Sequence, residues 1–170
     1  NSLPVRHADL WGRPPAATVL HQRGVSGIDG QIAGAAGASV GADAPTLAMI
    51  GDVSFLHDLG GLSAARRATR ALVILVVDNQ GGRIFERLPV HGAIAGADFE
   101  ELFAMPPAID IEAAAQTFGH RYASVDSPAS LASALDDALA HDACTVVRTV
   151  VADGREADRA LEAAIGTAAR

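Results

Sequence analysis

Several residue types are scarce in this chain of 170 residues, and each scarcity excludes a class of protein. There is one cysteine, Cys144, so the chain can form no internal disulfide and no cysteine-based zinc site. Because Cys144 lies in an apolar run, we expect it to be a buried core thiol. Aromatic residues make up only 4% of the sequence, so the core must be built from Ala, Val, Leu and Ile.

Positive charge and long apolar runs are also scarce. The net charge is −7 and no basic cluster exceeds the pair Arg66-Arg67, which argues against nucleic acid as a partner. The longest apolar run, residues 71–77, is too short to cross a bilayer, and residues 1–9 are too polar for a signal peptide. We therefore expect a cytoplasmic protein with no membrane contact. Because the chain begins with Asn1 rather than Met, we expect either a processed N-terminus or a piece of a longer chain.

What the chain does have is apolar residues, at 49% against 19% charged, enough to offset the ordering entropy of one domain. Its patterning predicts five strands at residues 18–21, 46–50, 72–77, 122–125 and 145–151. It predicts helices at residues 28–40, 56–69, 111–118, 131–139 and 156–169. Strands alternating with helices predict a doubly wound α/β fold, with a mainly parallel sheet and helices on both faces.

Two segments stand out in this pattern. Residues 72–77 are apolar on both faces, which predicts a central strand of a parallel sheet. Residues 81–107 interrupt the alternation with glycines and prolines. A segment of that length is expected to be either a functional loop or a disordered one.

Polar motifs stand at the ends of two consecutive predicted strands. Gly51-Asp52 ends the first, and Asp78-Asn79 ends the second. Because ligands of such sheets bind outside the carboxyl ends of the strands, we expect Asp52 and Asn79 to meet there. Mg²⁺ prefers hard oxygen ligands, usually one or two carboxylates together with phosphate oxygens. The helix after Asp52 would direct its N-terminus at those phosphates. On spacing alone, a chance pair of strand-to-helix turns is the alternative.

This arrangement resembles the cofactor motif of thiamine diphosphate (ThDP) enzymes, a Gly-Asp followed at a similar distance by a pair of asparagines. The resemblance implies that Asp52, Asn79 and the Gly81 carbonyl hold Mg²⁺, with Mn²⁺ as an alternative ion. Two positions depart from the pattern, because Val53 stands where the family often has glycine and Asp78 where it has the first asparagine. Neither departure removes a proposed metal ligand.

Four strings narrow the resemblance. Residues 1–6, 23–30, 51–59 and 79–85 are similar, in order and in spacing, to the SEPHCHC synthase family (2-succinyl-5-enolpyruvyl-6-hydroxy-3-cyclohexene-1-carboxylate synthases) of menaquinone biosynthesis. The string Arg-Gly-x-x-Gly-Ile-Asp-Gly is far more specific than the metal motif. The resemblance covers residues 1–151 and implies the C-terminal, diphosphate-binding domain of such an enzyme.

Members of this family decarboxylate 2-oxoglutarate and add the resulting succinyl semialdehyde–ThDP carbanion to isochorismate, giving SEPHCHC and CO₂. The resemblance implies that the cofactor is contacted by Ile28, Gly51, Asp52, Val53, Ser54, Asn79, Gly81, Gly82 and Ile84. It implies that the substrates are contacted by Ser2, Arg6, Arg23, Ile84 and Phe85. Guanidinium groups suit the carboxylates of both substrates. The alternative for Arg6 and Arg23 is that they are exposed surface residues. The alternative for Ile28 is a core position, and for Ile84 and Phe85 it is that they anchor a mobile loop.

The family also uses a pyrimidine-binding domain that supplies an activating glutamate, and the sequence offers no counterpart to it. We therefore expect residues 1–170 to form a single diphosphate- and Mg²⁺-binding domain, without the pyrimidine-binding and central domains. Such a chain carries no catalytic residue of its own and should be inactive alone. Because one wall of the shared site is missing, we expect it to associate with the pyrimidine-binding domain of the same protein and to form a homo-oligomer.

Three other hypotheses stay open. Another ThDP-dependent 2-oxo-acid decarboxylase or synthase would share the metal motif, but a monocarboxylic substrate needs fewer cations than Arg6 and Arg23 provide. An NAD(P)-binding domain should show Gly-x-Gly-x-x-Gly directly after a strand, whereas Gly24, Gly27 and Gly30 lie three residues apart. The third hypothesis is a non-catalytic fragment of a cofactor domain that only assembles with a partner.

Overall fold

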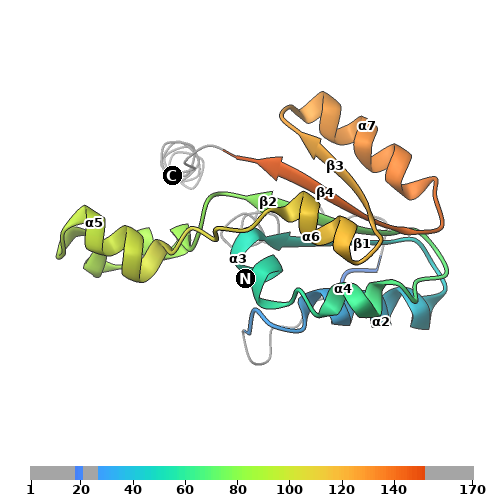
Figure 1. The fold of residues 1–170 in the computed structure, drawn as a ribbon, viewed down its shortest axis with the longest axis horizontal. Coiled ribbons are helices and arrows are strands. Elements are labelled where there is room, and N and C mark those ends of the chain that lie inside the picture. The colour runs from blue at the N-terminus through green and yellow to red at the C-terminus, as the bar shows by residue number, and fades with distance from the viewer. Residues whose placement is uncertain (1–17, 21–26, 152–170) are drawn as a thin grey trace, which may run out of the picture.

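The computed structural model describes residues 18–20 and 27–151, and within them a four-stranded parallel sheet forms the centre of the molecule (Figure 1). The strands are β1 (Thr46–Gly51), β2 (Leu72–Asp78), β3 (Arg121–Val125) and β4 (Cys144–Val150). They lie in the order β1-β2-β4-β3, and every pair is parallel. The α/β fold predicted from the sequence is confirmed.

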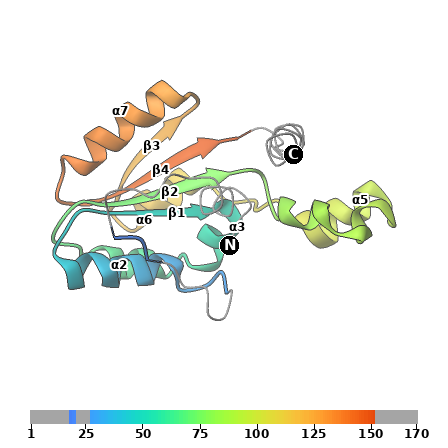
Figure 2. The ribbon, with the colours of Figure 1, turned by 180° about the vertical axis from the view of Figure 1, so that it is seen from behind.

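Helices cover both faces of this sheet (Figure 1, Figure 2). One face is covered by α2 (Gln31–Ala42), α3 (Asp52–His57), α4 (Gly61–Ala65) and α6 (Ile111–Thr117). The other face carries α7 (Pro128–Leu139). Side chains cap two of these helices, since Asp110 accepts a hydrogen bond from the Ala113 N–H, and Ser127 forms a capping box with Ser130.

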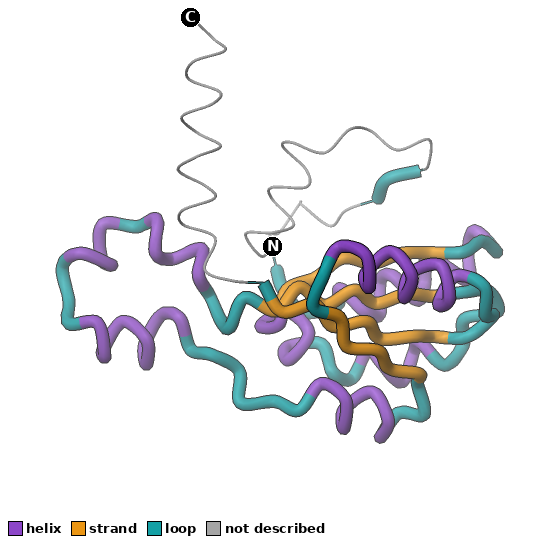
Figure 3. The backbone as a smooth tube through the Cα atoms, turned by 90° about the horizontal axis from the view of Figure 1, so that it is seen from above, coloured by secondary structure: helices purple, strands orange, loops and turns teal. Residues whose placement is uncertain are grey.

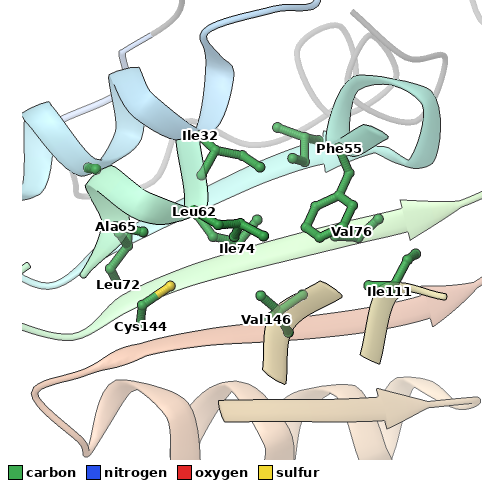
Figure 4. Close-up of a cluster of buried hydrophobic side chains, with 13 residues drawn as sticks. Ile32, Phe55, Leu62, Ala65, Leu72, Ile74, Val76, Ile111, Cys144 and Val146 are labelled. Atoms are coloured by element: carbon green, nitrogen blue, oxygen red, sulfur yellow. The ribbon is translucent and has the colours of Figure 1, made fainter. Parts of the chain in front are cut away.

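The core is divided by β2, all of whose residues are buried. Because alternate side chains of a strand point to opposite faces, β2 contributes to both layers. Leu72, Ile74 and Val76 face α2 and α4, and Val73, Leu75 and Val77 face α7. Cys144 lies in the first layer, 5% exposed, and burial raises the pKa of its thiol to about 12 (Figure 4). The expected buried thiol is confirmed.

Some predicted elements were wrong. Residues 18–20 form no strand, and the rest of that predicted strand lies outside the described residues, as does the predicted helix at 156–169. The single helix predicted at 56–69 is two helices, α3 and α4. At the break, the Asp58 carboxylate accepts hydrogen bonds from the Ile32 and Ala33 N–H groups at the start of α2, at 2.6 and 3.0 Å. That contact is made across 26 residues and leaves no periodic pattern in the sequence.

The segment predicted as a functional or disordered loop is instead a helical arm, residues 83–105. It contains the 3₁₀-helices Arg83–Arg87 and Pro89–Gly92, the helix α5 (Gly96–Phe99) and the π-helix Glu100–Ala104. The arm projects from the sheet (Figure 3). Phe99 stacks on Phe103, with ring centroids 5.5 Å apart, and Arg83 pairs with Glu100. The arm thus has a small aromatic core of its own. No helix among the described residues is both long enough and apolar enough to cross a membrane.

Candidate functional site

The carboxyl ends of β1 and β2 bring the two polar motifs together. Gly51, the last residue of β1, lies opposite Val77 of β2, and α3 begins at Asp52 directly after it. The chain after β2 turns back at Asn79. As a result Asp52, which is 2% exposed, faces the turn at residues 79–81.

Three groups converge at this point. The Gly81 N–H donates a hydrogen bond to Asp52 Oδ2 over 2.6 Å. One terminal atom of the Asn79 amide lies 3.1 Å from Asp52 Oδ1 and 3.1 Å from the Gly81 carbonyl oxygen. In the present orientation of the amide this atom is the oxygen, so three oxygens face one another. In the flipped orientation the Asn79 NH₂ group would donate hydrogen bonds to Asp52 Oδ1 and to the Gly81 carbonyl oxygen.

This donor set fits a small divalent cation. Adjacent oxygens around an octahedral Mg²⁺ with bonds of about 2.1 Å are about 3 Å apart, and the two separations from Asn79 match that spacing. A carboxylate, an amide oxygen and a backbone carbonyl are all hard ligands. The residues predicted as metal ligands are therefore brought together by the fold, although the sequence motif was their only earlier support.

Burial makes the Asp52 carboxylate unusual. It raises the pKa of Asp52 to about 6; the hydrogen bond from Gly81 opposes this rise, and the nearby Asp78 carboxylate adds to it. At neutral pH Asp52 is mostly ionised in a place that disfavours charge. A cation bound there would stabilise the ionised form.

A cavity of about 150 Å³ opens beside these groups. It is lined by Ile28, Asp52, Val53, Ser54, Asn79, Gly81, Gly82, Arg83, Ile84 and Phe85. Of the residues predicted to contact the cofactor, only Gly51 does not line it. Of those predicted to contact substrates, Ile84 and Phe85 do, whereas Ser2, Arg6 and Arg23 lie outside the described residues.

Two arginines near this edge of the sheet had no role predicted from the sequence. Arg83 lines the cavity, and its guanidinium is committed to Glu86 and Glu100 of the arm. Arg148 lies on β4 and contacts Asp78. The one signal that pointed to Arg148 was a charged residue inside an otherwise uncharged predicted strand.

The turn at Gly81 is packed tightly against the end of the arm. Gly81 has a φ of 113°, and a Cβ there would overlap the Ala104 carbonyl oxygen. The same oxygen accepts a hydrogen bond from the Gly82 N–H over 2.6 Å. Both the left-handed conformation and the close approach require glycine at this position.

Gly81→Ala should lower the free energy of unfolding by roughly 2–4 kcal/mol, because strain and overlap act together. Urea denaturation followed by circular dichroism measures this change. The matched control is Gly37→Ala, in an exposed position of α2 where a Cβ meets nothing within 4 Å. That control should raise stability by up to about 1 kcal/mol, because alanine favours helix. Equal stability of Gly81→Ala and the unchanged chain would contradict the close packing of the turn.

Comparison with known proteins adds an independent line of support. The family model "Thiamine pyrophosphate enzyme, C-terminal TPP binding domain" matches residues 3–149. The chain is 47% identical over 157 residues to the 2-succinyl-5-enolpyruvyl-6-hydroxy-3-cyclohexene-1-carboxylate synthase of Sorangium cellulosum (strain So ce56), covering 89% of this chain and 25% of that protein. It is 43% identical over 150 residues to the synthase of the same name from Chlorobaculum parvum, covering 86% and 25%.

A solved structure agrees on the fold. The thiamine diphosphate-dependent 4-hydroxybenzoylformate decarboxylase of Rhodococcus jostii RHA1 superposes with a TM-score of 0.57 at 27% identity, covering 70% of this chain and 22% of that one. The chain thus spans about a quarter of the length of the curated relatives it matches.

Proposed function

The chain belongs to the thiamine pyrophosphate (thiamine diphosphate) enzymes, as a C-terminal cofactor-binding domain, and we propose that it supplies the Mg²⁺ and diphosphate half of their cofactor site. The observation that carries this proposal is the convergence of Asp52, Asn79 and the Gly81 carbonyl at the end of the sheet, where the Asn79 amide lies 3.1 Å from an oxygen of each of the other two. Two diphosphate oxygens and a water would complete six ligands around Mg²⁺ or Mn²⁺.

Each part of the cavity has a distinct task in this proposal. Asp52, Asn79 and Gly81 hold the ion, and the ion holds the diphosphate. Gly82 lets the backbone approach the ligand closely, since it has no side chain. Ile28 and Ile84 line the same cavity and keep water from the apolar part of the cofactor. The bound cofactor supplies the electron sink that makes decarboxylation of a 2-oxo acid feasible.

For the parent enzyme we propose the reaction named by its curated relatives. It decarboxylates 2-oxoglutarate and joins the remaining four-carbon unit to isochorismate in menaquinone biosynthesis. The identities of 47% and 43% support this choice over other branches of the family. Ser2, Arg6 and Arg23 are the proposed partners of the substrate carboxylates, and Phe85 lines the cavity beside the cofactor in this scheme.

The remainder of the parent protein is part of the proposal. We propose that the chain is one domain and that the pyrimidine-binding domain, the central domain and the activating glutamate lie elsewhere in the parent protein; the chain spans 25% of its Sorangium relative, which leaves room for them. We propose that it associates with that pyrimidine-binding domain and works as a cytoplasmic homo-oligomer.

A second candidate is another ThDP-dependent 2-oxo-acid decarboxylase. The structural likeness to a 4-hydroxybenzoylformate decarboxylase favours it, at a lower identity of 27%. The two candidates share the cofactor site and differ in the substrate. Turnover of 2-oxoglutarate with isochorismate by the complete enzyme, against turnover of an aromatic 2-oxo acid, separates them.

Calorimetric titration of ThDP into the 170-residue chain tests the cofactor site. We expect binding in Mg²⁺, none in EDTA, and none by Asp52→Ala, because that variant loses the only carboxylate of the proposed ligand set. The matched control is Asp136→Ala, an exposed carboxylate on α7 at the opposite face of the sheet, which should bind as the unchanged chain does. Binding that persists in EDTA or in Asp52→Ala would contradict the proposed site.

A further inference from the structure

A half-buried ion pair lies directly behind the turn that carries two of the proposed metal ligands. Asp78, the last residue of β2, is 6% exposed and precedes Asn79. Arg148 lies on the neighbouring strand β4, opposite Val76. Its Nε donates to Asp78 Oδ2 over 2.8 Å, and its Nη2 donates to the same oxygen. An ion pair thus joins β2 and β4 immediately beside the turn at residues 79–81.

The other oxygen of Asp78 shapes the turn itself. Asp78 Oδ1 accepts a hydrogen bond from the Gln80 N–H over 3.0 Å, the local bond of an Asx turn. Gln80 and Gly81 have φ angles of 60° and 113° in succession. A left-handed conformation is unfavourable for glutamine, so the backbone needs an external restraint to stay there. Asp78 Oδ1 is that restraint, and the turn it closes contains Asn79 and leads directly into Gly81.

The charge of Asp78 makes the arginine necessary. Asp78 and Asp52 are both buried at the same edge of the sheet, and their carboxylates repel each other. The cofactor motif that the sequence resembles has a neutral asparagine where Asp78 stands. A neutral side chain needs no counter-ion, whereas a buried carboxylate without one is costly. Arg148 supplies the counter-ion.

Arg148 approaches the turn at residues 79–81 from outside the cavity that Asn79 and Gly81 line. It lines a neighbouring cavity of about 250 Å³ with Asp52, Asp78, Gln80 and a wall of prolines and isoleucines. It does not line the cavity that contains Asn79 and Gly81. The hydrogen bonds that join Arg148 to this edge of the sheet go to Asp78, so Asp78 is its link to the turn at residues 79–81.

We propose that Arg148 is a positioning residue for the metal site, which holds Asp78 so that its free oxygen closes the turn presenting Asn79 and the Gly81 carbonyl. Arg148 also draws the Asp78 carboxylate away from the cation position and leaves Asp52 as the only carboxylate ligand. This inference rests on the proposed metal and diphosphate site. It assigns a role to the Asp78–Arg148 pair that the metal ligands themselves do not reveal.

Mn²⁺ binding to the 170-residue chain tests the inference, followed by electron paramagnetic resonance in the presence of inorganic diphosphate. Arg148→Leu should weaken Mn²⁺ binding by about tenfold or more, the usual effect of losing a partner behind a metal ligand. The double variant Asp78→Asn/Arg148→Leu should recover most of that loss. Its new amide oxygen can still accept from the Gln80 N–H, and an uncharged side chain needs no counter-ion. The matched control is Arg121→Leu, which removes an exposed arginine of β3 paired with Asp137.

Each outcome bears on a different claim. No Mn²⁺ binding by the unchanged chain would overturn the proposed metal site, and this inference with it. Binding by Arg148→Leu equal to that of the unchanged chain would overturn only the inference, as would a double variant no better than Arg148→Leu. If Arg148→Leu does not fold, Arg148→Lys replaces it, since lysine keeps the charge but loses the planar two-nitrogen contact. The same recovery by Asp78→Asn is then expected.

Discussion

Asp52→Asn should abolish Mg²⁺-dependent binding of ThDP and, at the same time, make the metal-free chain more stable. The binding loss follows because an amide offers one weaker oxygen where the ion needs a carboxylate. The gain in stability follows because burial disfavours the charge of Asp52. Asparagine keeps the oxygen that accepts from the Gly81 N–H and removes the charge. Loss of function with a gain in stability is the expected signature of a strained ligand.

The stability gain should depend on pH in a defined direction. The pKa of Asp52 is about 6 in the folded chain and 3.8 in the reference state, so the folded chain holds the proton more tightly. The cost of ionisation is therefore absent below pH 3.8, grows as pH rises toward 6, and reaches about 3 kcal/mol above it. The difference in free energy of unfolding between Asp52→Asn and the unchanged chain should follow the same course.

Urea denaturation in EDTA at several pH values measures this difference, with Asp136→Asn as the exposed control. Adding Mg²⁺ and diphosphate should reverse the order, because ligands stabilise only the chain that binds them. A variant less stable than the unchanged chain at pH 7 in EDTA would contradict the account of Asp52 as a destabilised carboxylate.

The 170-residue chain alone should turn over no 2-oxoglutarate, with or without isochorismate, and activity should appear when the missing domains are added. The physical reason is that, in the proposed arrangement, the chain provides only one wall of the site. Its cavity is lined by the proposed metal ligands and by apolar side chains, and the described residues that line it include no carboxylic acid other than Asp52. No group among them is free to exchange a proton with the cofactor's pyrimidine ring.

The complementation is measured as CO₂ release after mixing the chain with a separately produced fragment containing the pyrimidine-binding and central domains of a curated relative. The mixture should lose this activity when the chain carries Asp52→Ala and keep it with Asp136→Ala. Turnover by the chain alone would refute the incomplete-site proposal. A complemented mixture that decarboxylates aromatic 2-oxo acids instead would favour the second candidate function.

The sequence predicted the parts of the fold that depend on local pattern. Residues 72–77 were predicted as a central strand because all of their side chains are apolar, and β2 does lie between β1 and β4. The pairing of Asp52 with Asn79 followed from the rule that parallel strands end at one edge. Both predictions needed only the order of the residues along the chain.

The features that were missed depend on contacts between distant residues. At the break between α3 and α4, Asp58 contacts the start of α2, and in the helical arm Phe99 stacks on Phe103. The Asp78–Arg148 pair joins residues 70 positions apart. Sequence periodicity does not predict such contacts, because a charged or aromatic side chain could pair with many residues until the fold brings one of them close.

The strand order carries a consequence for synthesis of the chain. Because β4 lies between β2 and β3, β2 has an open hydrogen-bonding edge until Cys144–Val150 leaves the ribosome, long after Leu72–Asp78 has done so. During that interval the most apolar strand of the described sheet is a template for non-native pairing with other chains. Closing the sheet also costs the entropy of a long loop, which slows folding. Shielding of β2 until β4 has been synthesised would therefore reduce non-native pairing of a chain with this strand order.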